Sequence, residues 1–266
     1  TVLPCTHVFH SNCVAQLRRL GVQSVCPLCR GELLSGPTEL HDRAMRRYVV
    51  IYGRIGRGEA KWHALTVAEQ REMGEVASMT RSAAEQGLVL AQYNMGIMLN
   101  NGHGIAKDFK GANKWFRKAA ERCRAPYPEA AEFRPQFELG VNCRDGNGVK
   151  QDYKEAVKWF REAAEKGSGN AQGCLARMYE TGRGVSQDSR VAAKWMRSAA
   201  EDGGGDIAQY NWANYLSDGT GVTQNYVEAM TWYLKAEAQG RESATNAQHN
   251  IGMMYVKKGR GVSLSA

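Results

Sequence analysis

The sequence predicts a mostly α-helical protein in which a small metal-binding segment is followed by a solenoid of repeated helix pairs. Two observations predict the solenoid. A Gly-x-Gly pair recurs five times at intervals of 36 to 44 residues, and a tryptophan follows the first glycine by 13 residues in each of the four complete copies. A third observation, six cysteine and histidine residues within positions 5 to 29, predicts the metal-binding segment.

The metal-binding segment contains three pairs of candidate ligands. They are Cys5, His7, His10, Cys13, Cys26 and Cys29. Zinc is held in proteins by tetrahedral sets of thiolates and imidazoles, and a Cys-x-x-Cys turn places two thiolates on one ion. The segment therefore predicts zinc as the cofactor. Three pairs can close one four-coordinate site, but they cannot close two.

Cysteine use favours the cytoplasm or another reducing intracellular compartment, because the clustered cysteines alternate with histidines at metal-ligand spacing and the total of seven is odd. The three cysteines outside the segment, Cys123, Cys143 and Cys174, are expected to be packing residues. Four other histidines have no partner at ligand spacing and are expected on the surface or in loops. They are His41, His63, His103 and His249.

A stretch that contains glycine and proline at residues 31–38 predicts a linker. We accordingly predict a zinc-binding domain at residues 1–34 and a repeat domain at residues 35–266. The repeat units are predicted at about 39–87 (degenerate), 91–123, 136–167, 171–203, 208–240 and 247–266 (partial). Because residue 1 is Thr rather than Met and the last unit stops within a repeat, we expect both ends of the natural protein to lie outside this sequence.

Each unit is predicted to contain two helices. The first has apolar residues at three- and four-residue spacing, as in residues 91–99, and ends where glycine can adopt the left-handed conformation that closes a helix. The second begins at an N-cap residue. The N-cap candidates are Asp108, Asp152, Asp188 and Asn225. A unit of this size cannot bury its apolar face alone, so stacking of units is expected.

The second helices share a pattern of rings and small residues. Their tryptophans are Trp115, Trp159, Trp195 and Trp232, and paired or neighbouring alanines follow each one. This fixed register predicts that the tryptophans lie in the core instead of forming a base-stacking surface or a ligand cage. The first unit is irregular, with helices expected at 44–58 and 67–87, and residues 124–135, which hold three of the six prolines, are expected to be an insertion.

The repeat resembles the Sel-1-like repeat, a relative of the tetratricopeptide repeat. The resemblance rests on Ala-Gln-Tyr-Asn at 208–211, Gly-Thr-Gly-Val at 219–222, Glu-Ala at 228–229 and Trp-Tyr-x-x-Ala at 232–236, and it extends over about 220 residues. It implies a right-handed α/α solenoid that organises protein complexes and has no catalytic residues of its own. Asn94, Asn211 and Asn250 recur in the first helices, where they could line a peptide groove or make structural hydrogen bonds.

The metal-binding segment resembles a RING finger of the His-His type. The order Cys-x-His-x-x-His-x-x-Cys, followed by Cys-Pro-Leu-Cys-Arg, carries this resemblance. The crossed ligand pairing of that family implies one complete zinc site and one half-site. The complete site is Cys5, His7, Cys26 and Cys29, and the half-site is His10 and Cys13. The missing pair is expected upstream of residue 1.

The resemblance also implies an activity. RING fingers are ubiquitin ligases that hold a ubiquitin-conjugating enzyme charged with ubiquitin, without a covalent intermediate on the ligase. By motif match, Leu17 and Pro27 would form part of the surface that binds the conjugating enzyme, and Arg30 would bridge that enzyme and ubiquitin. Leu17 stands where tryptophan is more usual, which implies a smaller docking surface. The repeats would then hold a client protein.

Other readings of the sequence remain open or are disfavoured. The alternative function is a non-catalytic scaffold stabilised by zinc. A secreted Sel-1-like protein with hydrolase activity is disfavoured, because such relatives carry paired cysteines in their repeats. The first 58 residues hold eight basic against three acidic residues but no interleaved aromatic stripe, so a solvated basic face is expected and no nucleic-acid partner is predicted. No apolar run approaches the roughly 18–20 residues of a membrane span.

Overall fold

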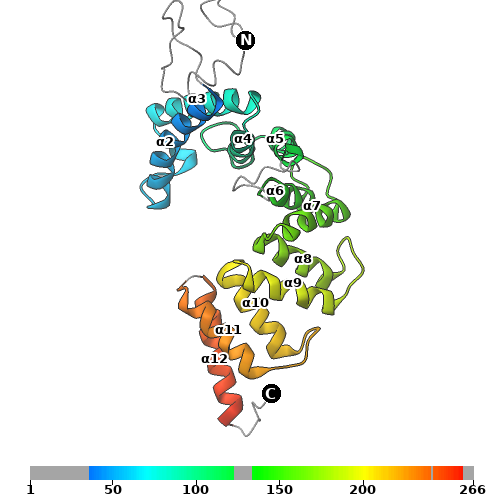
Figure 1. Cartoon of the computed structure of the whole chain (residues 1–266). Helices are drawn as coiled ribbons and strands as arrows, with labels where there is room; N and C mark the ends of the chain where they lie inside the picture. The colour runs from blue at the N-terminus through cyan, green and yellow to red at the C-terminus, as the bar shows by residue number, and fades with distance from the viewer. Residues whose placement is uncertain (1–35, 123–133, 241, 260–266) are drawn as a thin grey trace, which may run out of the picture. The chain divides into compact units, whose positions relative to one another are not determined.

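The computed structural model describes residues 36–122, 134–240 and 242–259, and the regular structure in these ranges is entirely helical (Figure 1). The helices pair in the order of the repeats, which confirms the predicted mostly α-helical solenoid. The chain divides into two compact units, one ending at Trp115 and the other beginning at Phe116. None of the helices in these ranges combines the length and hydropathy that a bilayer-spanning segment requires.

From residue 36 onward the first unit contains α2 (Pro37–Gly56), α3 (Val67–Glu85) and α4 (Val89–Asn101), with the 3-10 turn η1 (Trp62–Ala64) between the first two. Helix α2 packs against α3, and α3 packs against α4. The capping box at the start of α3 is complete, since Thr66 accepts from the Glu69 backbone and the Glu69 carboxylate accepts from the Thr66 backbone. Helix α5 (Phe109–Arg122) contains the boundary between the two units.

The predicted linker ends earlier than expected. Pro37 and Thr38, which were assigned to the linker, form the first turn of α2. Proline is favoured at this position because its fixed φ suits a helix and its missing N–H would be unsatisfied there in any case. The helix expected at residues 44–58 therefore begins seven residues earlier.

The described residues of the second unit continue with seven helices. They are α6 (Arg134–Asp145), α7 (Tyr153–Glu165), α8 (Gly169–Thr181), α9 (Ser189–Glu201), α10 (Gly205–Asp218), α11 (Tyr226–Ala238) and α12 (Glu242–Gly259). Each packs against the next along the chain, and α8 also contacts α10. Pro135, which was assigned to the insertion, lies in the first turn of α6, while residues 124–133 lie outside the described ranges.

The ends of the helices follow the predicted capping pattern. Asp152, Asp188 and Asn225 each accept a hydrogen bond from the backbone of the first turn that follows them. Gly182 closes α8 in the left-handed conformation, with φ of 67°. The second glycine of the pair, Gly184, has a different role, because a Cβ there would overlap the backbone carbonyl of Tyr153. Gly-x-Gly thus ends one helix and lets the following loop lie against the preceding unit.

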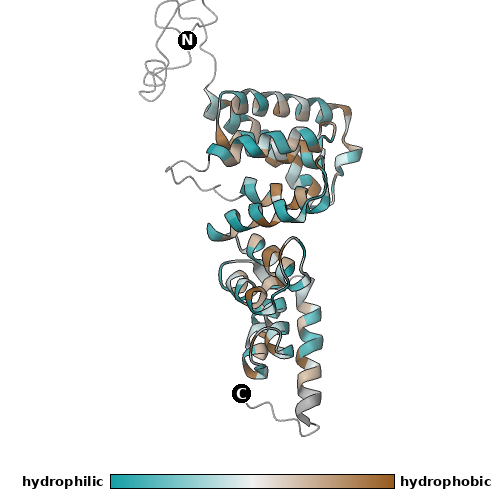
Figure 2. Cartoon of the chain, turned by 90° about the vertical axis from the view of Figure 1, so that its right-hand side faces the viewer, coloured by the Kyte–Doolittle hydropathy of each residue, from teal (hydrophilic) through white to brown (hydrophobic). Residues whose placement is uncertain are grey.

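The core differs from the prediction in one respect. The ring that follows the tryptophan is the fully buried one, as Phe160 shows with 0% exposure, whereas Trp159 is only half-buried. Tyr233 and Trp232 repeat this difference. Neighbouring residues of a helix point about 100° apart, so only one of the two rings can face the centre of the core. The paired alanines are buried as expected, and Figure 2 shows apolar and polar residues interspersed along each helix.

A glutamine near the start of the first helix links successive helix pairs. The side-chain amide of Gln92 donates to the carbonyl of Ala84 at 3.1 Å, and Gln172 donates to the equivalent Ala164 at 3.3 Å. Both carbonyls lie in the last turn of the preceding second helix, where backbone acceptors lack partners within the helix. Each carbonyl also accepts from the backbone N–H of the glycine three residues later, so the glutamine adds a second hydrogen bond, one that joins successive helix pairs.

Candidate functional site

The predicted zinc ligands, together with Leu17, Pro27 and Arg30, lie outside the described residues. Elsewhere in the chain, the ranges that are described hold no group of three or more histidine, cysteine or acidic side chains that could bind a metal ion. The donor set at positions 5 to 29 itself, four thiols and two imidazoles in closely spaced pairs, suits zinc.

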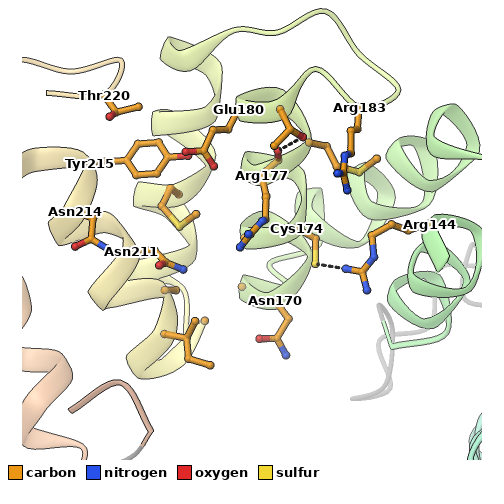
Figure 3. Close-up of a pocket in the computed structure, with 18 of the residues that line it drawn as sticks. Arg144, Asn170, Cys174, Arg177, Glu180, Arg183, Asn211, Asn214, Tyr215 and Thr220 are labelled. Atoms are coloured by element: carbon orange, nitrogen blue, oxygen red, sulfur yellow. Dashed lines mark hydrogen bonds between the residues drawn. The ribbon is translucent and has the colours of Figure 1, made fainter. Parts of the chain in front are cut away.

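The second unit contains a cavity of about 800 Å³ that is lined mainly by the first helices of two successive repeats, α8 and α10, with Arg144 of α6 at its edge (Figure 3). Its volume is within the range of small-molecule pockets. The lining combines the apolar side chains of Met178, Met196 and Ile207 with several charged and amide groups. Met178 and Met196 are buried, whereas Ile207 is 55% exposed.

The space in this cavity arises where α8 departs from the repeat. Gly173 occupies the position that is Tyr93 in α4, Phe137 in α6 and Tyr210 in α10. A Cβ at Gly173 would meet nothing within 4 Å. Helix α8 therefore lacks the ring that its counterparts carry, and open space lies over its backbone at that point.

The charged groups of the cavity differ in what they contact. Arg144 forms an ion pair with its neighbour Asp145 at 2.7 Å and donates to the sulfur of Cys174 at 3.8 Å. Arg183 lies over the ring of Tyr153, 5.5 Å from its centroid. Arg177 is exposed and has no ion pair with any carboxylate in the part of the chain that the structure describes.

One acidic side chain of the cavity, Glu180, lies close to a tyrosine. Figure 3 shows the ring of Tyr215 directed at Glu180. Burial raises the pKa of Tyr215, and the carboxylate of Glu180 raises it further. Tyr215 consequently stays protonated near neutral pH. The second acidic residue of the lining, Asp218, lies at the C-terminal end of α10.

The three recurring asparagines have two different roles. The Asn94 amide hydrogen-bonds His41 at 3.2 Å, and the Asn250 amide donates to the hydroxyl of Tyr233 at 3.1 Å. These are structural hydrogen bonds within the repeats. Asn211 instead lines the cavity, so a role in a peptide groove stays a prediction at that position.

The two cysteines in the described part of the second unit are free thiols. Cys143 is 4% exposed and packs in the core formed by α7 and α8, which confirms its predicted packing role. Cys174 is half-buried at the cavity wall, and burial raises its thiol pKa although the nearby Arg144 acts in the opposite direction. A thiol with a raised pKa is a poor nucleophile at neutral pH.

In the first unit, two histidines that were predicted to lie on the surface or in loops are buried. His103 is 8% exposed, stacks on Trp62 with ring centroids 4.2 Å apart, and its Nδ1 lies 2.7 Å from the hydroxyl of Tyr48. His41 is 2% exposed and bonds Asn94. Both therefore join α2 to α4 or to the residues that follow α4, while His63 and His249 are exposed as predicted.

These buried histidines predict a pH dependence of stability. Burial lowers the pKa of both His41 and His103 from the ordinary value of 6.5. Above about pH 6.5 both are neutral in the folded and unfolded chain; below it the unfolded chain takes up protons first, so the free energy of unfolding should fall. Urea denaturation at pH 8, 7, 6 and 5 measures this.

The matched variants for this prediction are His103→Gln and His63→Gln. The first should flatten the loss of stability between pH 7 and pH 5, because it removes one buried titrating group, and the second should leave the loss unchanged, because His63 is exposed. Equal pH profiles for the parent and His103→Gln would contradict this explanation.

Two family models match the chain. The Sel1 repeat matches residues 89–122, 136–168, 171–204 and 206–240, which together make up just over half of the sequence. The zinc finger of C3HC4 type (RING finger) matches residues 1–29. These matches confirm the fusion inferred from the sequence. They indicate a protein that interacts with other proteins, and the finger implies zinc binding.

Solved structures support the same fold. A protective antigen of uropathogenic Escherichia coli with an SLR fold, c5321, is 27% identical with a TM-score of 0.68; the match covers 86% of this chain and 43% of that one. A Sel1 repeat protein from Oxalobacter formigenes is 25% identical with a TM-score of 0.66, over 96% of this chain and 94% of that one. The chain thus spans less than half of c5321. No curated protein matches it.

Proposed function

Because the chain belongs to the Sel1 repeat family and begins with a segment that matches RING fingers, we propose that it is a ubiquitin-protein ligase. In this proposal residues 1–34 bind a ubiquitin-conjugating enzyme charged with ubiquitin, and residues 35–266 bind a client protein. The observation that carries the proposal is the order and spacing of the six ligands, ending in Cys26-Pro27-Leu28-Cys29-Arg30.

Zinc would have a structural role in this domain. Cys5, His7, Cys26 and Cys29 would hold one ion, and His10 with Cys13 would contribute to a second. Bound zinc stabilises the short loops that carry the docking residues, because a segment of this size has too small a core to fold without it. No ligand of this set needs to act as a nucleophile or base.

The residues around the ligands would perform the transfer step by positioning. Leu17 and Pro27 would contact the conjugating enzyme, and the Arg30 guanidinium would donate hydrogen bonds to both the enzyme and ubiquitin. Restraining the mobile ubiquitin would place its thioester in reach of a client lysine. The free energy of binding offsets the entropy that ubiquitin loses when it is held in one orientation. The lysine amine would attack the thioester carbonyl of the charged enzyme, so that an amide bond to ubiquitin forms and the cysteine of the enzyme leaves as a thiolate, with no bond to the ligase.

A transfer reaction tests the proposal. The full-length protein should give ubiquitin-modified product when combined with ATP, activating enzyme, ubiquitin and a panel of conjugating enzymes. Absence of product with every conjugating enzyme in the panel would leave the alternative, in which the finger is a zinc-stabilised adaptor without enzymatic activity.

The ligand assignment makes a prediction about zinc content. The 266-residue chain should bind close to one zinc ion tightly, because only one of its two sites has four ligands. His7→Ala should remove most of this affinity, while the matched variant His10→Ala should retain it, since His10 belongs to the incomplete site. Competition against a chromophoric chelator measures both. Two ions of comparable affinity, or equal losses in the two variants, would contradict the assignment.

A further inference from the structure

Two features of α8 meet in the cavity over Gly173: open space above the helix backbone and the unpaired charge of Arg177. The missing ring at Gly173 leaves the space, and Arg177 lies one helical turn later on the same face. The corresponding residues of the other first helices are Ile97, Val141 and Asn214, none of them charged. Gly173 and Arg177, the two residues at which α8 differs from the other first helices, therefore both line this cavity.

The charges around Arg177 leave it free for an external partner. Arg144 is held by Asp145, Arg183 lies over Tyr153, and Glu180 lies against Tyr215. Arg177 has no ion pair in the described ranges, and Figure 3 shows it between Cys174 and Asn211. A guanidinium exposed beside a recess is well placed to pair with a carboxylate, and its fork geometry favours two parallel hydrogen bonds.

The remaining lining suits an extended peptide. Asn170 and Asn211, one from each of α8 and α10, have side-chain amides that can both donate to and accept from a peptide backbone. Met178, Met196 and Ile207 supply apolar contacts next to the open space. A ligand that satisfies all of these groups needs backbone amides, one large apolar side chain and one carboxylate.

The spacing on α8 predicts the spacing in the ligand. Gly173 and Arg177 are four residues apart, which is about 6 Å along the axis of a helix. Two residues of an extended chain span about 6.6 Å, and their side chains point in the same direction. We propose that the cavity binds an extended segment of a client protein in which an aspartate or glutamate lies two residues from a large apolar residue. The apolar side chain fills the space over Gly173, and the carboxylate pairs with Arg177.

The carboxylate should belong to a side chain within the segment. Arg177 lies on α8, between Arg144 of α6 on one side and Asn211 of α10 on the other (Figure 3), so the chain of a bound segment can continue in both directions past it. This inference deepens the client-binding role proposed above and rests on it.

Peptide selection on the whole 266-residue chain tests the inference. The probe is a phage library of random 12-residue peptides, displayed between constant segments so that no terminus is free. The parent protein should enrich an acidic residue two positions from a large apolar one. The Arg177→Glu variant should instead enrich peptides that carry lysine or arginine in place of the acidic residue and keep the large apolar residue. Gly173→Tyr, which restores the ring of the other repeats, should abolish enrichment of the pair.

A synthetic peptide of the selected sequence completes the test. Changing its acidic residue to the matching amide should weaken binding to the parent about tenfold or more, as loss of a charge-assisted hydrogen bond does. The same change should have little effect on binding to Arg177→Gln. Circular dichroism establishes whether the Gly173→Tyr variant folds. If it does not fold, the peptides selected by the Arg177→Glu variant test the inference instead.

The inference is overturned if the parent enriches no peptide, if the enriched peptides lack an acidic residue, or if Arg177→Glu selects the same sequences as the parent. Selection requires neither zinc nor a conjugating enzyme. A protein that selects the motif but transfers no ubiquitin would therefore refute the ligase proposal alone, and a ligase that selects nothing would refute the peptide site alone.

Discussion

Replacing Arg30 with alanine should reduce the rate of ubiquitin transfer by on the order of 10- to 100-fold while zinc content stays unchanged. Arg30 directly follows the last ligand, Cys29, and is not itself a ligand. Its proposed role is to hold ubiquitin in the orientation from which its thioester is attacked, so its loss should lower the rate of transfer more than the affinity for the conjugating enzyme. Discharge of ubiquitin from a preloaded conjugating enzyme onto free lysine measures that rate.

The controls separate positioning from folding and from charge. Arg18→Ala removes an equal charge from the same segment and should leave discharge within about twofold of the parent. Arg30→Lys keeps the charge but loses the planar fork, so it should recover only part of the rate. Unchanged discharge in Arg30→Ala, or equal losses in the Arg18 and Arg30 variants, would exclude a bridging role for Arg30.

The repeat architecture could be predicted from the sequence because its signals are local. Glycine at a helix end and aspartate or asparagine at a helix start act through their own backbone neighbourhood, and Gly182 and Asp152 do so in the structure. Recurrence at a fixed period then identifies the solenoid. The start of α2 was missed because Pro37 can belong to a linker or to a first turn, and only packing against α3 distinguishes the two.

Buried polar contacts were less predictable. His41 and His103 were expected at the surface, yet they bond Asn94 and Tyr48, residues more than 50 positions away in the sequence. No periodicity in a single sequence indicates such pairs. The cavity had a signal that was overlooked, since Gly173 interrupts a column of rings, but its significance depends on the open space beside it.

Phe160→Ala should be among the most destabilising single substitutions in the described part of the second unit, at about 3–5 kcal/mol. Phe160 is fully buried, and its ring lies where a Cβ at Gly140 would approach to 2.6 Å, so α6 and α7 are in close contact at this point. Removing the ring leaves a cavity that neither backbone can collapse to fill. Urea denaturation followed by circular dichroism measures the change.

The adjacent Trp159→Ala is the matched control. Tryptophan is the larger side chain, so a ranking by size would place its loss first, but Trp159 is partly exposed to solvent whereas Phe160 is fully buried, and its removal should cost roughly 1–2 kcal/mol. Because a solenoid is stabilised by contacts between neighbouring units, the loss at Phe160 should also weaken the docking of α8 on α7, and with it the cavity over Gly173. A larger loss in Trp159→Ala would mean that the tryptophans, as the sequence first suggested, are the principal core residues of the repeat.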